Sequence, residues 1–210
     1  AHLKLGITRL PMGRLPSLRD LATSHAVHDV ARDLKADVLH GHGAKGGAFA
    51  RLAARDLRLE ARNVATFYTP HGGSLHYRWN SPAGLLYLML ERLLLPRTDL
   101  FLFESAYGRA VFAEKIGRPE PSCVVHNGVS AAEFEPVASD PSATDLLFVG
   151  ELRLLKGVDV LIDAIATLAK KGQPVTATIV GEGPDRSTFE AAVTAHGLGH
   201  AVKFVGAMPA

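Results

Sequence analysis

Short, continuous apolar runs alternate along this chain with longer segments whose apolar residues recur every three or four positions. The continuous runs are typical of strands covered on both faces, because neither side of such a strand needs polar residues. The seven predicted strands span residues 36–40, 63–69, 99–105, 123–128, 145–150, 175–181 and 202–206. Strands that alternate with helices predict an α/β fold with parallel sheets and right-handed crossovers.

The segments between the strands carry helical patterns of unequal clarity. In the clearest of them a single stripe of a helix collects the apolar residues Val158, Leu161, Ile162, Ile165, Leu168 and Ala169. Ser187 and Glu190 have the spacing of a capping box, which predicts a helix that starts at Ser187. Residues 84–95 predict a helix that lies mostly in the core. They are broken by Glu91 and Arg92, and they are far fewer than the roughly 20 residues a membrane span needs.

The alternation of strands and helices is interrupted once, at residues 133–145. This stretch contains two prolines and few periodic apolar residues, so we interpret it as a linker. We therefore place a domain boundary near Val137. Residues 1–136 predict a Rossmann-like domain, and residues 137–210 predict the first three strands and two helices of a second one.

Composition narrows the function classes. The chain has 210 residues, and 23 Lys and Arg against 21 Asp and Glu give a net charge of +2. This near balance gives no reason to expect a nucleic-acid-binding surface. Cys123 is the single cysteine, so no intrachain disulfide can form and a cytosolic setting is compatible. We expect Cys123 to pack as a small apolar residue in its strand rather than to act as a catalytic thiol.

Histidines follow the predicted strands of the first domain. Ligands bind outside the carboxyl ends of parallel strands, and His40, His42, Lys45, His71, His126 and Asn127 all lie at or just after such ends. Metal ligation by the histidines is one interpretation, but no Asp, Glu or Cys lies at a matching spacing. A hydrogen-bonded strand-end role is favoured for His40.

His71 differs because it stands between Pro70 and Gly72 at an end that should face a ligand. Its imidazole could polarise a substrate hydroxyl or accept its proton, with a structural role as the alternative. A basic and aromatic patch at Tyr77, Arg78 and Trp79 could contact a lipid headgroup or a large acceptor. A solvated loop with one packed indole explains the same residues.

The second domain places glycines and cations at its strand ends. Gly150 ends a strand, Arg153 and Lys156 follow, and Gly157 precedes the clearest helix. Glycine lets the backbone approach a ligand, the helix start offers unpaired amides, and the two cations can bind phosphate oxygens. The pattern predicts a diphosphate site, with the turn from Gly181 to Pro184 as a second backbone segment beside it. An ordinary surface loop remains the alternative.

Taken in order, these motifs resemble the GT-B glycosyltransferases of family 4, over nearly the whole chain. The resemblance implies two Rossmann-like domains, a nucleotide-diphosphate sugar as donor, and transfer of a hexose with retention to a glycan or lipid-linked acceptor. It implies no cofactor and no metal. It further implies a part in polysaccharide biosynthesis and a cytoplasmic location, with peripheral membrane contact as an additional expectation and no nucleic-acid partner.

The resemblance also assigns roles to residues. His71 matches the family's histidine beside the reacting sugar and is the expected catalytic residue. The expected donor-binding residues are Gly150, Arg153, Lys156, Gly181 and Gly183. On the acceptor side we expect His42, Lys45 and Asn127.

The chain departs from the family pattern in three places. Glu151 stands where the family's loop carries arginine, and Arg153 is the candidate replacement. The family's paired-glutamate motif would fall beyond Ala210. Ala1 to Leu10 resembles a later strand of the first domain, so the family's first strand and glycine-rich loop would be missing. We therefore expect an incomplete transferase. A sugar-nucleotide epimerase of the same fold and a non-catalytic nucleotide-binding remnant are the alternatives.

Overall fold

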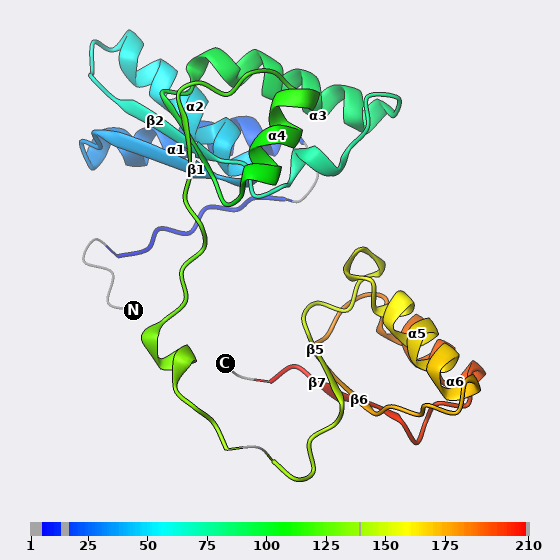
Figure 1. The fold of residues 1–210 in the computed structure, drawn as a ribbon. Helices are drawn as coiled ribbons and strands as arrows, with labels where there is room; N and C mark the ends of the chain where they lie inside the picture. Colours follow the sequence, from blue (N-terminus) through cyan, green and yellow to red (C-terminus); the bar gives the residue numbers. More distant parts are fainter. Residues whose placement is uncertain (1–5, 14–16, 139, 209–210) are drawn as a thin grey trace. The chain divides into compact units, whose positions relative to one another are not determined.

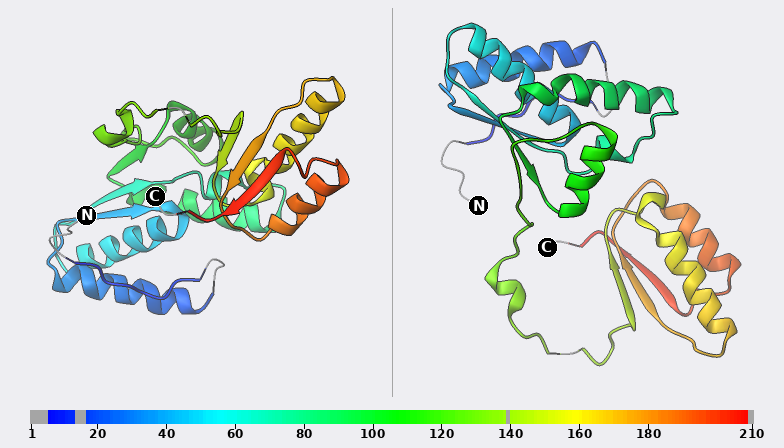
Figure 2. Two further views of the ribbon diagram at one scale, coloured as in Figure 1. Left: turned by 90° about the horizontal axis from the view of Figure 1, so that it is seen from below. Right: turned by 45° about the horizontal axis from the view of Figure 1, so that its top comes forward.

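The chain divides into two compact units, Ala1–Ser130 and Ala131–Ala210. The computed structural model describes residues 6–13, 17–138 and 140–208. Each unit has a parallel sheet of its own, as the ribbon views show (Figures 1 and 2). The predicted α/β architecture of two Rossmann-like parts is therefore confirmed.

The sheet of the first unit has four parallel strands, arranged in the order in which they occur along the chain. They are β1 (Val38–His42), β2 (Ala65–Thr69), β3 (Leu100–Phe103) and β4 (Ser122–Val124). The helices between and before them are α1 (Arg19–Asp33), α2 (Gly43–Leu59), α3 (Pro82–Leu94) and α4 (Ala106–Lys115), with the short 3₁₀ turns η1 (Ser74–His76) and η2 (Leu95–Arg97). All four strands were predicted, within a few residues at each end.

Close packing of α2 on the sheet fixes where the first unit's strand ends lie. α2 packs against β1 and β2 and contacts α1 on its other side. Gly47 allows this approach, because a Cβ at that position would lie 2.1 Å from the Tyr68 ring. Tyr68 is fully buried and belongs to an aromatic core with Phe101 and Phe112. This packing holds the start of α2 beside the carboxyl ends of β1 and β2.

The second unit is built on three parallel strands, β5 (Leu146–Val149), β6 (Ala177–Val180) and β7 (Val202–Gly206), in sequential order. The helices α5 (Val158–Lys170) and α6 (Arg186–Ala195) lie on one face of this sheet (Figures 1 and 2). The predicted stripe of α5 is buried at Val158, Ile162 and Ile165, which pack with Ile179 and Phe189. Leu147 and Val149 of β5 stay exposed.

The connection between the units holds one short 3₁₀ turn, η3 (Ala131–Phe134). Over the described residues from 135 to 145 the chain forms neither helix nor strand. The predicted boundary near Val137 falls within this segment, whereas the compact units divide between Ser130 and Ala131.

Three local predictions were wrong. The N-cap of α6 is Asp185 rather than Ser187, and Glu190 accepts a hydrogen bond from Arg186 instead of closing a capping box. Cys123 is exposed on β4, which lies at the edge of the described sheet. No strand forms over residues 6–10, and residues 1–5 lie outside the described part of the chain.

α3 is also less buried than its composition predicts. Its buried positions are Gly84, Leu88, Glu91 and Leu94. The other face leaves apolar side chains in solvent: Leu85, Leu86, Met89, Leu90 and Leu93. The helix therefore has one buried and one exposed face, although apolar residues occupy both. A charged residue, Glu91, lies on its buried face.

Candidate functional site

Histidines from two neighbouring strands meet at one edge of the first sheet. In the β1–β2 pairing His40 lies opposite Phe67 and His42 opposite Thr69, so both strands end together. His71 follows β2 by two residues, and Glu104 directly follows β3. Parallel strands deliver their carboxyl ends to the same edge. Residues 29 and 33 positions apart in sequence are thereby brought into contact.

These side chains form a hydrogen-bonded chain. His71 Nδ1 is bonded to the Glu104 carboxylate, and His71 Nε2 lies 2.8 Å from His42 Nδ1. A carboxylate can only accept, so His71 carries its proton on Nδ1. A neutral His71 must then accept at Nε2 from the N–H of His42. Across the described part of the chain no hydrogen bond engages His42 Nε2, so this nitrogen is the open end of the Glu104–His71–His42 chain.

The backbone at His71 supports a functional reading of the chain. His71 has a φ of +49°, in the left-handed region that non-glycine residues seldom adopt. Strain of this kind persists where the surrounding structure holds it, and it clusters at functional sites. Here the two hydrogen bonds to Glu104 and His42 hold the imidazole in place.

His40 and His126 surround this chain without joining it. His40 Nε2 is bonded to Thr69 Oγ1 at 2.9 Å, and its ring lies 4.1 Å from the His42 ring between centroids. Burial lowers the pKa of His40, and the nearby His42 and His71 lower it further. This pKa favours a neutral ring at strand β1. His126 Nδ1 bonds the backbone carbonyl of Glu104 at 3.0 Å, and Asn127 follows it in an exposed segment.

Lys45 lies in the first turn of α2 but is directed away from the histidines. Its ammonium donates to the Gly13 carbonyl at 2.7 Å and to both carboxylate oxygens of Asp20 at 2.9 Å. The hydrogen bond from Lys45 is the main cause that lowers the pKa of Asp20. Lys45 thus ties α2 to α1 and to the segment before it.

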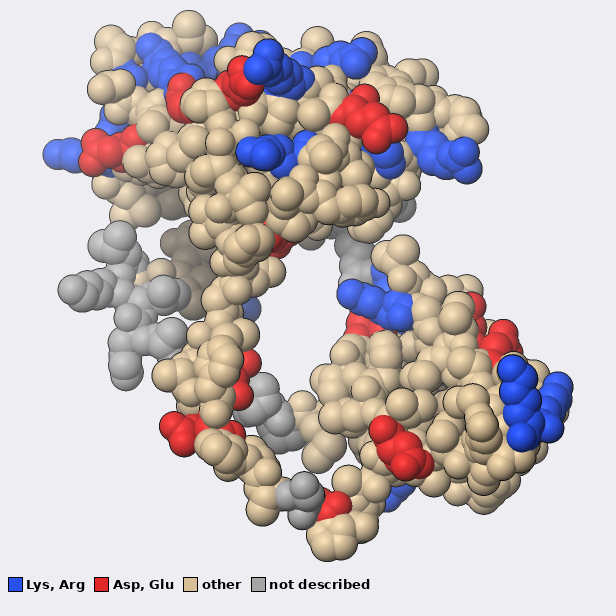
Figure 3. All heavy atoms as spheres, in the orientation of Figure 1, with Lys and Arg blue, Asp and Glu red and all other residues tan. Residues whose placement is uncertain are grey.

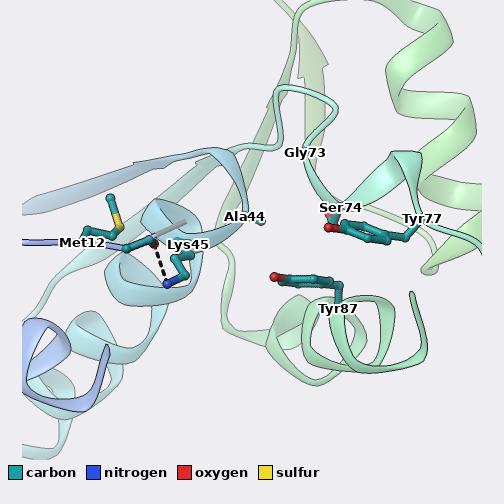
Figure 4. Close-up of a pocket in the computed structure, with 8 residues that line it drawn as sticks. Met12, Ala44, Lys45, Gly73, Ser74, Tyr77 and Tyr87 are labelled. Atoms are coloured by element: carbon teal, nitrogen blue, oxygen red, sulfur yellow. Dashed lines mark hydrogen bonds between the residues drawn. The ribbon is translucent and has the colours of Figure 1, made fainter. Parts of the chain in front are cut away.

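A pocket of about 360 Å³ opens beside Lys45 (Figure 4). We call it the tyrosine pocket; its lining residues are Met12, Gly13, Ala44, Lys45, Gly73, Ser74, Tyr77 and Tyr87. The rings of Tyr77 and Tyr87 stack with centroids 4.7 Å apart. Figure 4 shows both phenol oxygens on the side of the rings that faces Ala44 and Lys45.

A buried ionic network supports the wall of the tyrosine pocket. Glu91 of α3 accepts hydrogen bonds from Arg51 at 2.8 Å, Tyr68 at 2.5 Å and Ser74 at 3.0 Å. Arg51 and Glu91 are both almost completely buried, and the Arg51 guanidinium lies over the Tyr68 ring. Burial and the neighbouring Glu91 raise the pKa of Tyr68 well above its usual value. The network joins α2, β2, η1 and α3.

In the second unit the predicted glycine turns pack against each other. A Cβ at Gly181 would lie 1.9 Å from the Gly150 carbonyl oxygen, and one at Gly183 would lie 2.3 Å from that of Leu152. Backbone hydrogen bonds run from Gly150 N to Val180 O and from Leu152 N to Glu182 O, both at 3.0 Å. Gly181 and Gly183 are thus required first of all by contact between two backbone segments.

The basic turn after β5 leads directly into the start of α5, whose first turn carries Asp159. Leu154–Lys156 form the 3₁₀ turn η4, and Gly157, with a φ of +72°, leads into α5. The Lys156 side chain is exposed. Arg153 Nε lies 3.2 Å from Glu151 Oε1 in an ion pair, yet it makes no hydrogen bond within the described residues. Because Arg153 Nε is buried, only the terminal guanidinium nitrogens of this partly exposed side chain could meet a ligand.

The structure brings some predicted site residues together and separates others. His42 and His71 are in contact, and Gly150, Gly181 and Gly183 form one backbone cluster with the basic turn beside it. Lys45 belongs to the tyrosine pocket instead. Sequence reasoning missed Glu104 as the partner of His71. The spacing of residues along the chain placed no carboxylate near the histidines. Only the position of Glu104 directly after a strand could have indicated this contact.

No group of three or more His, Cys, Asp or Glu among the described residues is arranged to hold a metal ion. None of the described helices is both long and apolar enough to span a bilayer. The charged residues of the first unit are also dispersed: on the face seen in Figure 3, its Lys and Arg are interspersed with Asp and Glu rather than gathered into one patch.

Comparison with known proteins identifies the family of this chain. Residues 2–133 match the model of Glycosyltransferase Family 4, and residues 130–210 match that of Glycosyl transferases group 1. The chain belongs to glycosyltransferase family 4. This confirms the resemblance drawn from the order of its motifs, and it places the histidine chain in the first matched region and the basic turn in the second.

Individual relatives support the same fold. EpsD of Bacillus subtilis, described as a putative glycosyltransferase, is 29% identical over 215 residues, covering 94% of this chain and 55% of EpsD. HepE from Anabaena, solved with UDP and glucose, superposes with a TM-score of 0.72 at 22% identity, covering 92% of this chain and 54% of HepE. Sucrose-phosphate synthase from Thermosynechococcus elongatus gives a TM-score of 0.73 at 21% identity, with 94% and 53% covered. The chain spans about half the length of these three proteins.

Proposed function

We propose that the protein containing this chain transfers a hexose from a nucleotide-diphosphate sugar to a glycan or lipid-linked acceptor, with retention of anomeric configuration. No metal or cofactor is required in this proposal. Membership of family 4 and the solved relative with UDP and glucose support the donor class. A part in polysaccharide biosynthesis belongs to the same proposal.

One observation carries the proposal: the exposed Lys156, with Arg153 in the same turn, directly precedes the start of α5. As the bond between the anomeric carbon and the diphosphate oxygen breaks, negative charge collects on the departing diphosphate. Cations and unpaired helix amides stabilise that charge more in the transition state than in the bound donor. They thereby take the place of a metal ion.

In the same proposal the Glu104–His71–His42 chain receives the proton of the acceptor hydroxyl. The acceptor oxygen forms a bond to the anomeric carbon, and its proton passes to His42 Nε2. His42 Nδ1 then gives its proton to His71 Nε2, and the Glu104 carboxylate stabilises the resulting imidazolium. His71 acts through His42 in this scheme, and Glu104 is a positioning residue.

The proposal is tested with Lys156→Ala in the protein that contains this chain. Removing one contact to a developing charge commonly costs about 2.7–4 kcal/mol, so we expect transfer from UDP-glucose to fall about 100- to 1000-fold. Lys170→Ala is the matched control, because Lys170 is an exposed lysine at the opposite end of α5. Unchanged transfer by Lys156→Ala would refute the role of the basic turn.

Two further measurements separate the alternatives. Calorimetry with UDP-glucose that shows binding, together with an assay that shows no transfer to any acceptor, would favour a nucleotide-binding module. Conversion of the sugar nucleotide in the absence of an acceptor would favour an epimerase, since an epimerase needs none.

A further inference from the structure

We propose that the tyrosine pocket binds a neutral glycosyl unit of the acceptor through its hydroxyl groups. This inference rests on the proposed function, because it assigns the substrate class of the acceptor side. The inference predicts that the acceptor is recognised through a sugar unit and not through a phosphate group. Tyr87 was not among the residues expected to bind the acceptor, and Tyr77 was expected only as part of the basic and aromatic patch with Arg78 and Trp79.

The charge of the pocket argues against an anionic ligand. Among the described residues that line the pocket, Lys45 is the one that carries a charge, and its ammonium already donates to both Asp20 oxygens and to the Gly13 carbonyl. A paired lysine attracts a phosphate far less than an unpaired one, because the carboxylate cancels its charge. A phosphate would also lie close to Asp20. The pocket therefore selects against negative charge.

The remaining chemistry matches a sugar. The phenol oxygens of Tyr77 and Tyr87 face Ala44 and Lys45 (Figure 4), and each hydroxyl can both donate and accept a hydrogen bond, as a sugar hydroxyl does. Met12 and Ala44 supply apolar contact for the C–H groups of a sugar ring. The volume of about 360 Å³ lies at the small end of the range for ligand pockets and fits one or two sugar units.

The tyrosines are held in place before any ligand arrives. Lys115 of α4 donates to the backbone carbonyls of Leu75 and Tyr77, and Ser74 donates to the buried Glu91. The stacked rings brace one another at 4.7 Å. A site whose donors and acceptors are fixed in advance binds with less loss of conformational entropy.

The pocket also shares its loops with the histidine chain. Ala44 comes two residues after His42, and Gly73 comes two residues after His71. These loops approach closely, since a Cβ at Gly73 would lie 3.5 Å from the Ala44 nitrogen. A sugar bound to the tyrosines would thus lie against the start of α2 and the turn after β2, which adjoin His42 and His71.

The test uses the full 210-residue chain with labelled tyrosines, observed by NMR. The chain has four tyrosines, of which Tyr68 is buried and Tyr107 is exposed on α4 outside the pocket. We expect methyl α-D-glucopyranoside to shift the Tyr77 and Tyr87 signals and to leave Tyr107 unchanged. Tyr77→Phe and Tyr87→Phe keep the stacked rings and should each weaken binding about threefold to tenfold. Tyr107→Phe, the matched control, should have no effect.

Glucose 1-phosphate and inorganic phosphate are the opposing probes. If either binds the tyrosines more tightly than the methyl glucoside does, the pocket is an anion site and the inference is wrong. It is equally wrong if no probe shifts Tyr77 or Tyr87 at tens of millimolar. The binding experiment contains no sugar donor, so it does not depend on transfer. If the chain binds the glucoside but the protein that contains it transfers no sugar, the proposed function is wrong and the pocket assignment stands. Transfer with an acceptor KM unaffected by both Tyr→Phe variants would overturn the pocket alone.

Discussion

The two units use different chemical groups at the carboxyl ends of their parallel strands. In the first unit the strand ends present side chains that bond one another, namely Glu104, His71 and His42. In the second unit they present backbone, with Gly181 pressed against Gly150, and an exposed cation at Lys156. A fixed side-chain network suits proton transfer at one point. Backbone amides with an open cation suit a large anion.

The difference teaches that glycine and histidine in such loops respond to different constraints. A glycine turn is destabilised when a side chain is added, because the two backbone segments are already in contact. A network of polar side chains fails when one partner is removed, because the others are left buried or misdirected. The units should therefore have different sensitive positions, and substitutions can test this.

Gly181→Ala should produce the largest effect. Gly181 has a φ of +137°, and its new Cβ would lie 1.9 Å from the Gly150 carbonyl oxygen. Both backbone segments would have to separate, at a cost of about 5 kcal/mol or more, which approaches the whole stability expected of so small a unit. Hydrogen exchange should show that residues 146–206 lose protection while the first unit keeps it.

Gly199→Ala is the matched control in the same unit. A Cβ at Gly199 would meet nothing within 4 Å, so this variant should keep its protection. If Gly181→Ala exchanged no faster than Gly199→Ala, the contact between the two glycine turns would not be the constraint on this unit.

Glu91→Ala should produce the next largest effect, in the first unit. It would leave the buried Arg51 guanidinium without its carboxylate, and Tyr68 and Ser74 without an acceptor. Loss of one partner from a buried ion pair costs about 3–5 kcal/mol. Denaturant unfolding followed by Trp79 fluorescence measures it, since Trp79 is the single tryptophan and lies in the first unit.

The paired variant Arg51→Met with Glu91→Leu distinguishes charge from packing. Replacing both partners of a buried ion pair by apolar side chains is often neutral or stabilising. The double variant should therefore be more stable than Glu91→Ala. Equal losses in the two variants would mean that packing, not the uncompensated Arg51 charge, sets the cost.

The architecture could be predicted from the sequence because apolar runs of a strand's length recur between helical stripes. All seven strands were found in this way, and Val158, Ile162 and Ile165 lie in the core as their spacing requires. The errors fell where packing by neighbouring elements decides burial. Cys123 is apolar enough for a core strand, yet it is exposed on β4, an edge strand of the described sheet.

The sequence predicted where the site residues lie better than it predicted which residues they contact. Strand ends marked His42, His71 and Gly150, because topology alone brings such ends together. The partners could not be read from spacing. Glu104 meets His71 across two strands, and Glu91 lies on an apolar helix whose composition gave no sign that its charged residue faces inward. Such contacts depend on the register of the sheet and on the rotation of a helix.

Glu104→Gln should produce the smallest of these effects, and it tests whether the first unit's network acts in proton transfer. A neutral amide can still bond His71 Nδ1 but cannot stabilise the imidazolium by charge. We expect kcat for transfer from UDP-glucose to fall about tenfold to hundredfold, equivalent to about 1.4–2.7 kcal/mol. Affinity for UDP-glucose should stay unchanged, because the basic turn belongs to the other unit.

Glu114→Gln supplies the control, since Glu114 is an exposed glutamate on α4. Rescue of kcat by Glu104→Asp, whose carboxylate restores the charge, would distinguish proton transfer from a loss of fold. If Glu104→Gln instead weakened donor binding with kcat intact, the side-chain network would serve the donor. The contrast between a proton-handling first unit and an anion-binding second unit would then fail, because both sets of strand ends would act on the same ligand.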